Sequence, residues 1–78
     1  MLLQIYSVFD VVSNQSVFIT MHNNTLEAQR NFSSFSKNEQ IAEKVKDLRL
    51  YHLGEFNTTT LELVGLDPLD VTPESEAL

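Results

Sequence analysis

Four stretches of the chain have the short apolar runs or the two-residue alternation that predict β-strands. The first is Leu2–Val12, and after turn residues at 13–16 a second run covers Val17–Met21. Alternation returns over Arg49–Phe56, and Thr60–Val64 can pair back on it as a fourth strand. The first two strands are expected to form one hairpin and the last two another.

Alternation also divides the side chains of a strand between two faces. The face of the first strand expected to point inward carries Ile5, Ser7, Phe9 and Val11, and the outer face carries Gln4, Tyr6, Val8 and Asp10. On the third strand the inner face is expected to carry Leu50, His52, Gly54 and Phe56. Tyr6, Arg49 and Tyr51 would then lie together on the outer face.

Between the two hairpins the spacing of apolar residues becomes helical. Asn24 stands three residues before Glu27, the spacing at which an N-cap side chain and a carboxylate satisfy the free N–H groups of a helix start. A stripe follows at helical spacing, made of Leu26, Ala28, Phe32 and Phe35. Several serines interrupt this pattern before Ile41, Val45 and Leu48 resume it, so we expect one broken helix or two short ones.

These elements predict an α+β fold in the order β-β-α-β-β, with a four-stranded, mainly antiparallel sheet and the helical part on one face. Residues 1–66 are expected to form one domain. Residues 67–78 contain two prolines and four acidic residues, which oppose both helix and sheet, so we expect an acidic, disordered tail there.

With 78 residues and no cysteine, the chain has a small core and no disulfide to stabilise it, so association with a second copy is expected to add stability. The first 12 residues contain no Lys or Arg and predict a strand and not a secretion signal. No apolar run approaches the ~20 residues that cross a bilayer, and we expect no membrane partner.

Charge is distributed unevenly along the chain, whose net charge is −6. Residues 1–26 contain one acid, and residues 27–49 contain all five bases against four acids. Residues 50–78 contain six acids and no base. The sequence pI of about 4.6 argues against duplex DNA as the sole partner.

Catalytic motifs are missing from the sequence. Gly54 and Gly65 are the two glycines of the chain, so no phosphate-binding glycine loop can be written. His22 and His52 fall on different predicted elements, and each is expected to have an ordinary packing or surface role. We therefore expect no enzyme, no cofactor and no metal site.

The residues of the outer sheet face are compatible with two functions. Tyr and Arg side chains on an open sheet suit the stacking of unpaired bases. The same residue types are favoured at protein interfaces, so Tyr6, Val8 and Leu53 are the alternative candidates, for a dimer interface. The five bases can equally be a solvated helix face.

Three motifs in order resemble the small nonstructural protein of the gokushoviruses, a group of single-stranded DNA bacteriophages in the Microviridae. They are Ile5-Tyr6-Ser7-Val8-Phe9-Asp10, Ala28-x-Arg30-x-Phe32, and Asp47-x-x-Leu50-Tyr51-x-Leu53-Gly54-Glu55-Phe56-Asn57. In that family the last strand usually follows a turn that contains glycine. Residues 57–61 have none here, so a looser hairpin is expected.

The resemblance implies a protein made in the cytoplasm of the infected bacterium, absent from the virion, and active around single-stranded genome synthesis or packaging. The expected mechanism is non-enzymatic binding of single-stranded DNA by a homodimer. The residues expected to contact DNA are Arg30, Lys37, Lys44, Lys46, Arg49 and Tyr51. The alternative is a protein–protein adaptor or assembly factor, viral or host-directed, with no nucleic-acid contact.

Overall fold

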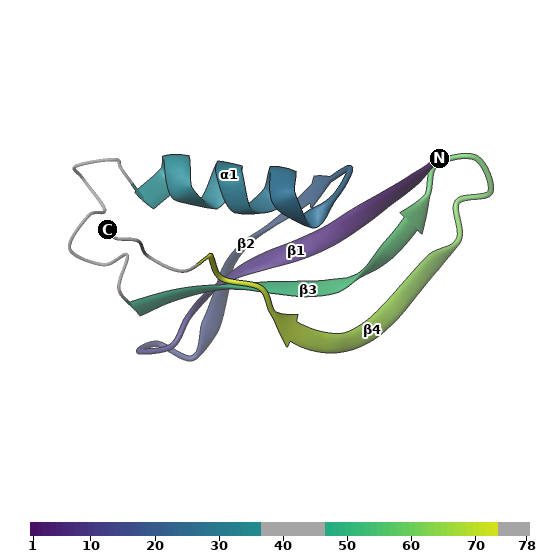
Figure 1. The fold of residues 1–78 in the computed structure, drawn as a ribbon. Helices are drawn as coiled ribbons and strands as arrows, with labels where there is room; N and C mark the ends of the chain where they lie inside the picture. Colours follow the sequence, from purple (N-terminus) through teal and green to yellow (C-terminus); the bar gives the residue numbers. More distant parts are fainter. Residues whose placement is uncertain (37–46, 74–78) are drawn as a thin grey trace.

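The computed structural model describes residues 1–36 and 47–73, which form one sheet with a helix packed on one face (Figure 1). The elements are β1 (Leu2–Asp10), β2 (Gln15–His22), α1 (Thr25–Ser36), β3 (Leu48–Asn57) and β4 (Leu63–Asp70). This order confirms the α+β fold predicted from the sequence. The second half of the predicted helix falls on residues 37–46, outside the described residues, except for Leu48, which begins strand β3 and was wrongly predicted as helical.

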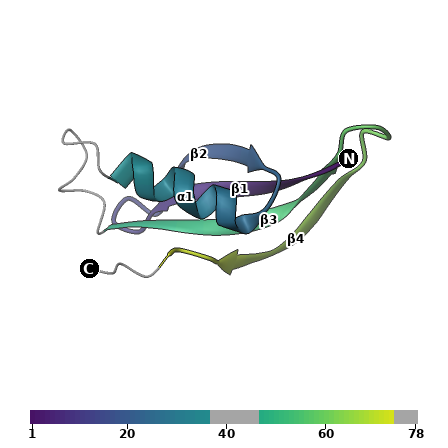
Figure 2. The same cartoon turned by 45° about the horizontal axis from the view of Figure 1, so that its top comes forward.

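All strand pairs are antiparallel, in the spatial order β2-β1-β3-β4. The interior strands are β1, which pairs with β2 and β3, and β3, which pairs with β1 and β4, so β2 and β4 lie at the two edges (Figure 2). Between β2 and β3 the chain runs as α1 across one face, and no other described element covers the opposite face.

The start of α1 follows the predicted cap at Asn24, whereas the Glu27 carboxylate binds the N–H of the preceding residue, Asn23, instead of the N–H of Asn24. The Asn24 side-chain oxygen accepts a hydrogen bond of 2.8 Å from the Glu27 N–H. The Glu27 carboxylate accepts the N–H of Asn23 at 3.1 Å, and this backbone hydrogen bond lowers the pKa of the Glu27 carboxyl group. No helix in the described part of the chain is long and apolar enough to cross a membrane.

The core lies between α1 and one face of the sheet. It consists of Tyr6, Val8, Ala28, Phe32, Leu48 and Leu50. The face prediction for β1 is therefore wrong, because Tyr6 and Val8 point toward α1 while Ser7 and Phe9 point away. Both faces of β1 carry large apolar residues, so alternation alone could not decide which face the helix covers.

One residue of the expected helical stripe also lies outside this core. Ala28 and Phe32 are buried beneath α1, as predicted, but the Leu26 side chain is 58% exposed. Leu26 lies in the first turn of α1, immediately after Thr25, whose hydroxyl hydrogen-bonds to that of Tyr6 at 2.9 Å. Of the stripe residues whose side chains the structure describes, Leu26 is thus the one that the core does not include.

The predicted boundary between domain and tail at Leu66 is wrong, because β4 continues to Asp70. After β4 the chain stays on the domain: Val71 donates its N–H to the Leu50 carbonyl at 2.8 Å and packs against the core. The Thr72 hydroxyl accepts the Leu50 N–H at 2.8 Å. Pro68 opposes a strand locally, but an edge strand can accommodate a residue that has no N–H. Residues 74–78 lie outside the described residues.

The β3–β4 hairpin closes without glycine. The Asn57 side-chain oxygen accepts the N–H groups of Thr59 at 2.9 Å and Thr60 at 3.1 Å. Leu61 then takes a positive φ of 67°, a left-handed conformation that glycine adopts most easily. The turn therefore forms without glycine because the Asn57 side chain caps its N–H groups, and Leu61 takes the left-handed conformation at a cost in backbone strain.

Candidate functional site

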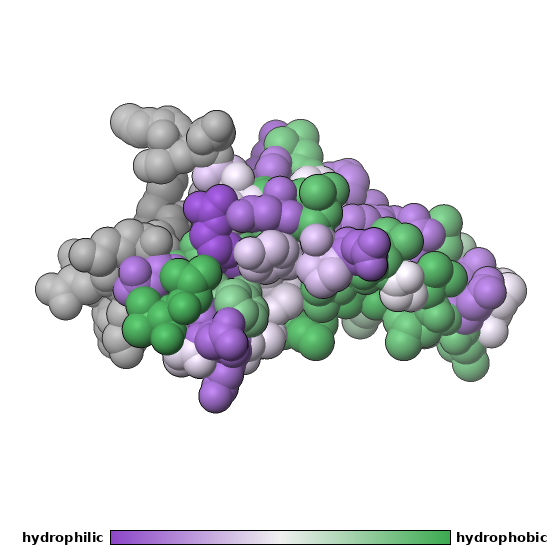
Figure 3. All heavy atoms as spheres, turned by 90° about the horizontal axis from the view of Figure 1, so that it is seen from below, coloured by the Kyte–Doolittle hydropathy of each residue, from purple (hydrophilic) through white to green (hydrophobic). Residues whose placement is uncertain are grey.

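The face of the sheet opposite α1 carries an open hollow of about 470 Å³. Figure 3 views the molecule from this side and shows apolar side chains interspersed with polar ones. We call this surface the open face and define it by the residues that line the hollow: Ser7, Phe9, Ser16, Ile19, Tyr51, Leu53 and Pro68. They come from all four strands, so the fold of the whole sheet is needed to assemble them.

An aromatic pair lies at the centre of the open face. In the β1–β3 register Ser7 pairs with Tyr51 and Phe9 with Arg49, which makes Phe9 and Tyr51 diagonal neighbours. Their ring centroids are 5.8 Å apart and their planes meet at 88°, an edge-to-face contact. Both side chains are partly exposed, so one side of the pair is available to a ligand.

Beside the aromatic pair, two serines join β1 to β2. The hydroxyls of Ser7 and Ser16 hydrogen-bond to one another at 2.6 Å, and Ser7 is 5% exposed. The hollow therefore has a small polar floor between Phe9 and Ile19.

Arg49 and Asp70 form an ion pair at the rim of the open face. The Arg49 guanidinium donates to one Asp70 carboxylate oxygen from Nε at 3.0 Å and from Nη2 at 2.9 Å. Desolvation raises the pKa of the Asp70 carboxyl group, but hydrogen bonds from Thr72 and Arg49 outweigh it and the pKa is lowered. The charge of Arg49 is thus partly neutralised within the chain.

The predicted DNA-contacting residues do not form a single basic surface in the described part of the protein. Arg49 and Tyr51 lie together on the open face, whereas Arg30 is exposed on α1, on the other side of the sheet. Lys37, Lys44 and Lys46 lie outside the described residues.

Two of the three residues predicted for the dimer interface are part of the core. Tyr6 is 0% exposed and Val8 is 3% exposed, because both point toward α1. Neither can meet another chain while α1 stays packed. Leu53 remains a candidate, since it lines the open face.

Of the four residues in the aromatic pair and the ion pair, sequence reasoning missed two. Phe9 was expected to point inward, and Asp70 was expected in a solvated tail. Phe9 forms the aromatic pair, and Asp70 is paired with the guanidinium of Arg49. Phe9 and Tyr51 both lie on strands that the sequence predicts, and this is the one signal in the sequence that they can be neighbours.

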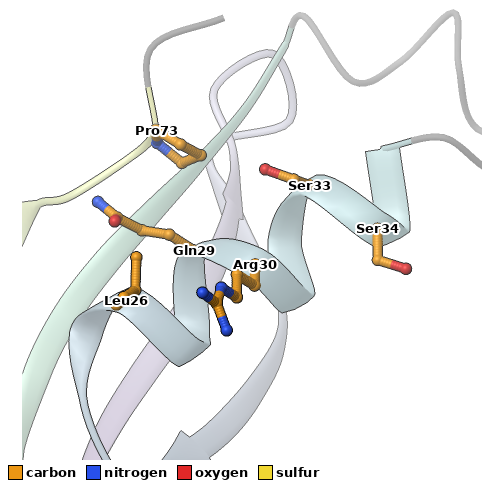
Figure 4. A pocket seen from close by; sticks show the side chains of 6 residues that line it. All are labelled: Leu26, Gln29, Arg30, Ser33, Ser34 and Pro73. Atoms are coloured by element: carbon orange, nitrogen blue, oxygen red, sulfur yellow. The ribbon is translucent and has the colours of Figure 1, made fainter.

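A second, smaller hollow of about 380 Å³ lies between α1 and the segment after β4 (Figure 4). Its lining consists of Leu26, Gln29, Arg30, Ser33, Ser34 and Pro73. The Gln29 side chain spans toward this segment and donates a 2.8 Å hydrogen bond to the Val71 carbonyl. This hollow contains no aromatic side chain and its main polar contact is already made, so the open face is the stronger candidate.

The two histidines lie beside the buried Tyr6 ring, on the helix side of the sheet. The centroid of the Tyr6 ring is 5.9 Å from that of His22 and 5.0 Å from that of His52. His52 also shares a 2.7 Å hydrogen bond with the Gln4 side chain. Among the described residues, no three His, Asp or Glu side chains are grouped so that they could hold a metal ion.

Comparison with known proteins identifies a family. Residues 3–77, nearly the whole chain, match the family model described as Phage ORF5 protein. No curated protein and no solved structure has significant similarity to the chain. The chain therefore belongs to the Phage ORF5 protein family.

Proposed function

We propose that this member of the Phage ORF5 family binds single-stranded DNA on the open face and so assists synthesis or packaging of a phage genome. The observation that supports the proposal is the Phe9–Tyr51 pair beside Arg49 on an uncovered antiparallel sheet. Aromatic rings on an exposed sheet stack with unpaired bases, and a nearby guanidinium can contact a base or a phosphate.

The proposal extends to the biological setting. The order of the three sequence motifs supports a gokushovirus nonstructural protein that works in the cytoplasm of the infected bacterium, is not built into the virion and acts without catalysis. The family match to a phage protein is consistent with this setting at a coarser level. Mass spectrometry of purified virions tests it, and a stoichiometric amount of the protein in virions would contradict it.

A titration of fluorescently labelled oligothymidine with the protein tests DNA binding. Tyr51→Ala should weaken binding by about five-fold to a hundred-fold, because stacking on one aromatic ring contributes about 1–3 kcal/mol per base. The matched control is Tyr51→Phe, which keeps the ring and should bind within about two-fold of the unsubstituted protein. Thermal unfolding of each variant checks that the sheet is intact.

Salt provides the second part of this test. Affinity should fall as salt rises, with a slope of about −0.7 per phosphate contact on a single strand. With Arg49 as the cation of the open face, that slope should be shallow and should decrease further in Arg49→Gln. Equal affinity for Tyr51→Ala and Tyr51→Phe would reject the open face as the DNA site.

The second candidate is a protein–protein adaptor or assembly factor that uses the same face. It is favoured by the apolar lining that Ile19, Leu53 and Pro68 provide, and by the net charge of −6, which repels phosphate. If the protein shows no saturable binding to single-stranded DNA at either low or high salt, the result would favour a protein–protein adaptor that uses the open face.

A further inference from the structure

The two edge strands of the sheet have very different sequences. β4 carries Asp67, Pro68 and Asp70, and its register with β3 is broken between His52 and Gly54. Charges, prolines and bulges are the features by which proteins prevent an edge strand from pairing with another chain. The half of β4 at residues 67–70 is therefore protected on its outer side, whereas residues 63–66 carry no charge and no proline.

β2 has much less protection. Gln15–His22 contains no charged residue and no proline, and it is the one strand of the described sheet without Asp, Glu, Lys or Arg. Its exposed apolar side chains are Val17, Ile19 and Met21, with 52%, 62% and 53% of their surface accessible. A bulge at Val17 interrupts the register with β1, but Phe18–His22 is regular. An exposed, uncharged edge of this kind can template another strand.

Charge determines what kind of strand can approach. Each copy of the chain carries a net charge of −6, so two copies repel one another except where their surfaces are uncharged. Residues 11–26 form a continuous stretch without a charged side chain, and β2 lies inside it. A second copy of this strand brings no charge to the contact and offers the same apolar alternation.

We propose that two copies of the chain pair along β2, antiparallel, so that their four-stranded sheets join into one sheet of eight strands. A twofold axis that relates two antiparallel edge strands stands perpendicular to the sheet, so both open faces lie on the same side. The Phe9–Tyr51 pairs of the two copies then face one common surface. The pairing is inferred from the sequence and exposure of β2, and it does not depend on DNA binding.

A pair of matched lysine variants tests the interface. Ile19 on β2 and Leu69 on β4 are 62% and 60% exposed, so Ile19→Lys and Leu69→Lys place the same charge on opposite edges at equal exposure. Light scattering of the unsubstituted protein and of Leu69→Lys should give the mass of two chains at micromolar concentration. Ile19→Lys should give the mass of one chain, with an unchanged circular dichroism spectrum and a dimer Kd at least tenfold higher.

Single cysteines give an independent measurement, because the chain has no cysteine of its own. Ile19 lies near the middle of β2, so Ile19→Cys stands close to its copy in the partner and should form an intermolecular disulfide under mild oxidation. Leu69→Cys should not. An intermolecular disulfide in Leu69→Cys but not in Ile19→Cys would overturn the proposal. This test does not depend on whether Ile19→Lys folds.

Hydrogen exchange distinguishes edge pairing from contact between two open faces. Pairing along β2 should protect the outward N–H groups of Phe18–His22, and dilution should remove that protection. A single-chain mass for the unsubstituted protein, or a dimer whose β2 amides exchange as fast as in Ile19→Lys, would overturn the proposal. None of these experiments includes DNA, so a result against pairing along β2 says nothing about DNA binding, and a failure to bind DNA says nothing about the pairing.

Discussion

At the scale of single residues, the rim of the open face is determined by the ion pair between Arg49 and Asp70. The two side chains are 43% and 37% exposed, so water screens much of their attraction. A DNA phosphate that binds Arg49 must compete with a carboxylate of the same chain. Asp70 therefore controls both the stability of β4 and the cation that the open face offers to a ligand.

The pH dependence of stability tests the state of Asp70. Because its pKa in the folded protein lies below the ordinary value of 3.8, its carboxylate stabilises the fold above that pH, and this contribution is lost as the pH falls through the folded pKa. Asp70→Asn should remove the contribution and cost about 0.2–1 kcal/mol near pH 7. Urea unfolding at pH 7 and pH 3 measures it. Asp67→Asn, an exposed acid on the same strand, should change neither curve.

The two glycines provide a second prediction at this scale. The carbonyl oxygen of Val64 lies where a Cβ on Gly54 would be, whereas nothing lies within 4 Å of a Cβ on Gly65. Gly54→Ala must separate β3 from β4 and should destabilise the protein by about 1–3 kcal/mol. Gly65→Ala should change the free energy of unfolding by less than about 0.5 kcal/mol. Equal effects in thermal unfolding would contradict the register of these strands.

At the scale of elements, capping and turn residues in the sequence predicted where elements begin and end better than the apolar pattern predicted which face of the sheet is buried. The Asn24 and Glu27 pair located the start of α1, and the turn residues located both hairpins. The choice of sheet face failed because β1 is apolar on both sides, and only the packing of α1 decides between them. The end of β4 was missed because Pro68 and the acids oppose a strand locally, while contacts with Arg49 and Leu50 hold the segment in place.

Truncation tests this correction for β4 and the residues after it. A chain that ends after Leu66 loses half of β4, the packing of Val71 and the Thr72 hydrogen bond to Leu50, and should lose more than about 2 kcal/mol of stability. A chain that ends after Pro73 keeps these contacts and should melt close to the full-length temperature. Equal melting of the two truncated chains would show that residues 67–73 behave as a tail.

At the scale of the whole molecule, the distribution of charge along the sequence is a poor guide to where a DNA-binding surface lies in the fold. The described part of the chain places Arg30 and Arg49 on opposite sides of the sheet, so the two cannot serve one straight DNA strand. The surface best suited to bases is aromatic and only weakly charged. Sequence reasoning proposed Tyr51 and Arg49 for it, but paired them with Tyr6, which is buried, and not with Phe9.

Under the proposed function the open face, and not the helix side, binds single-stranded DNA. The most direct test is a titration of isotope-labelled protein with oligothymidine, followed by two-dimensional NMR. The largest shift changes are expected at Phe9, Tyr51 and Leu53 and at the Arg49 side chain, with the residues of α1 nearly unmoved. Shift changes confined to α1, or none at saturating DNA, would contradict the proposed function.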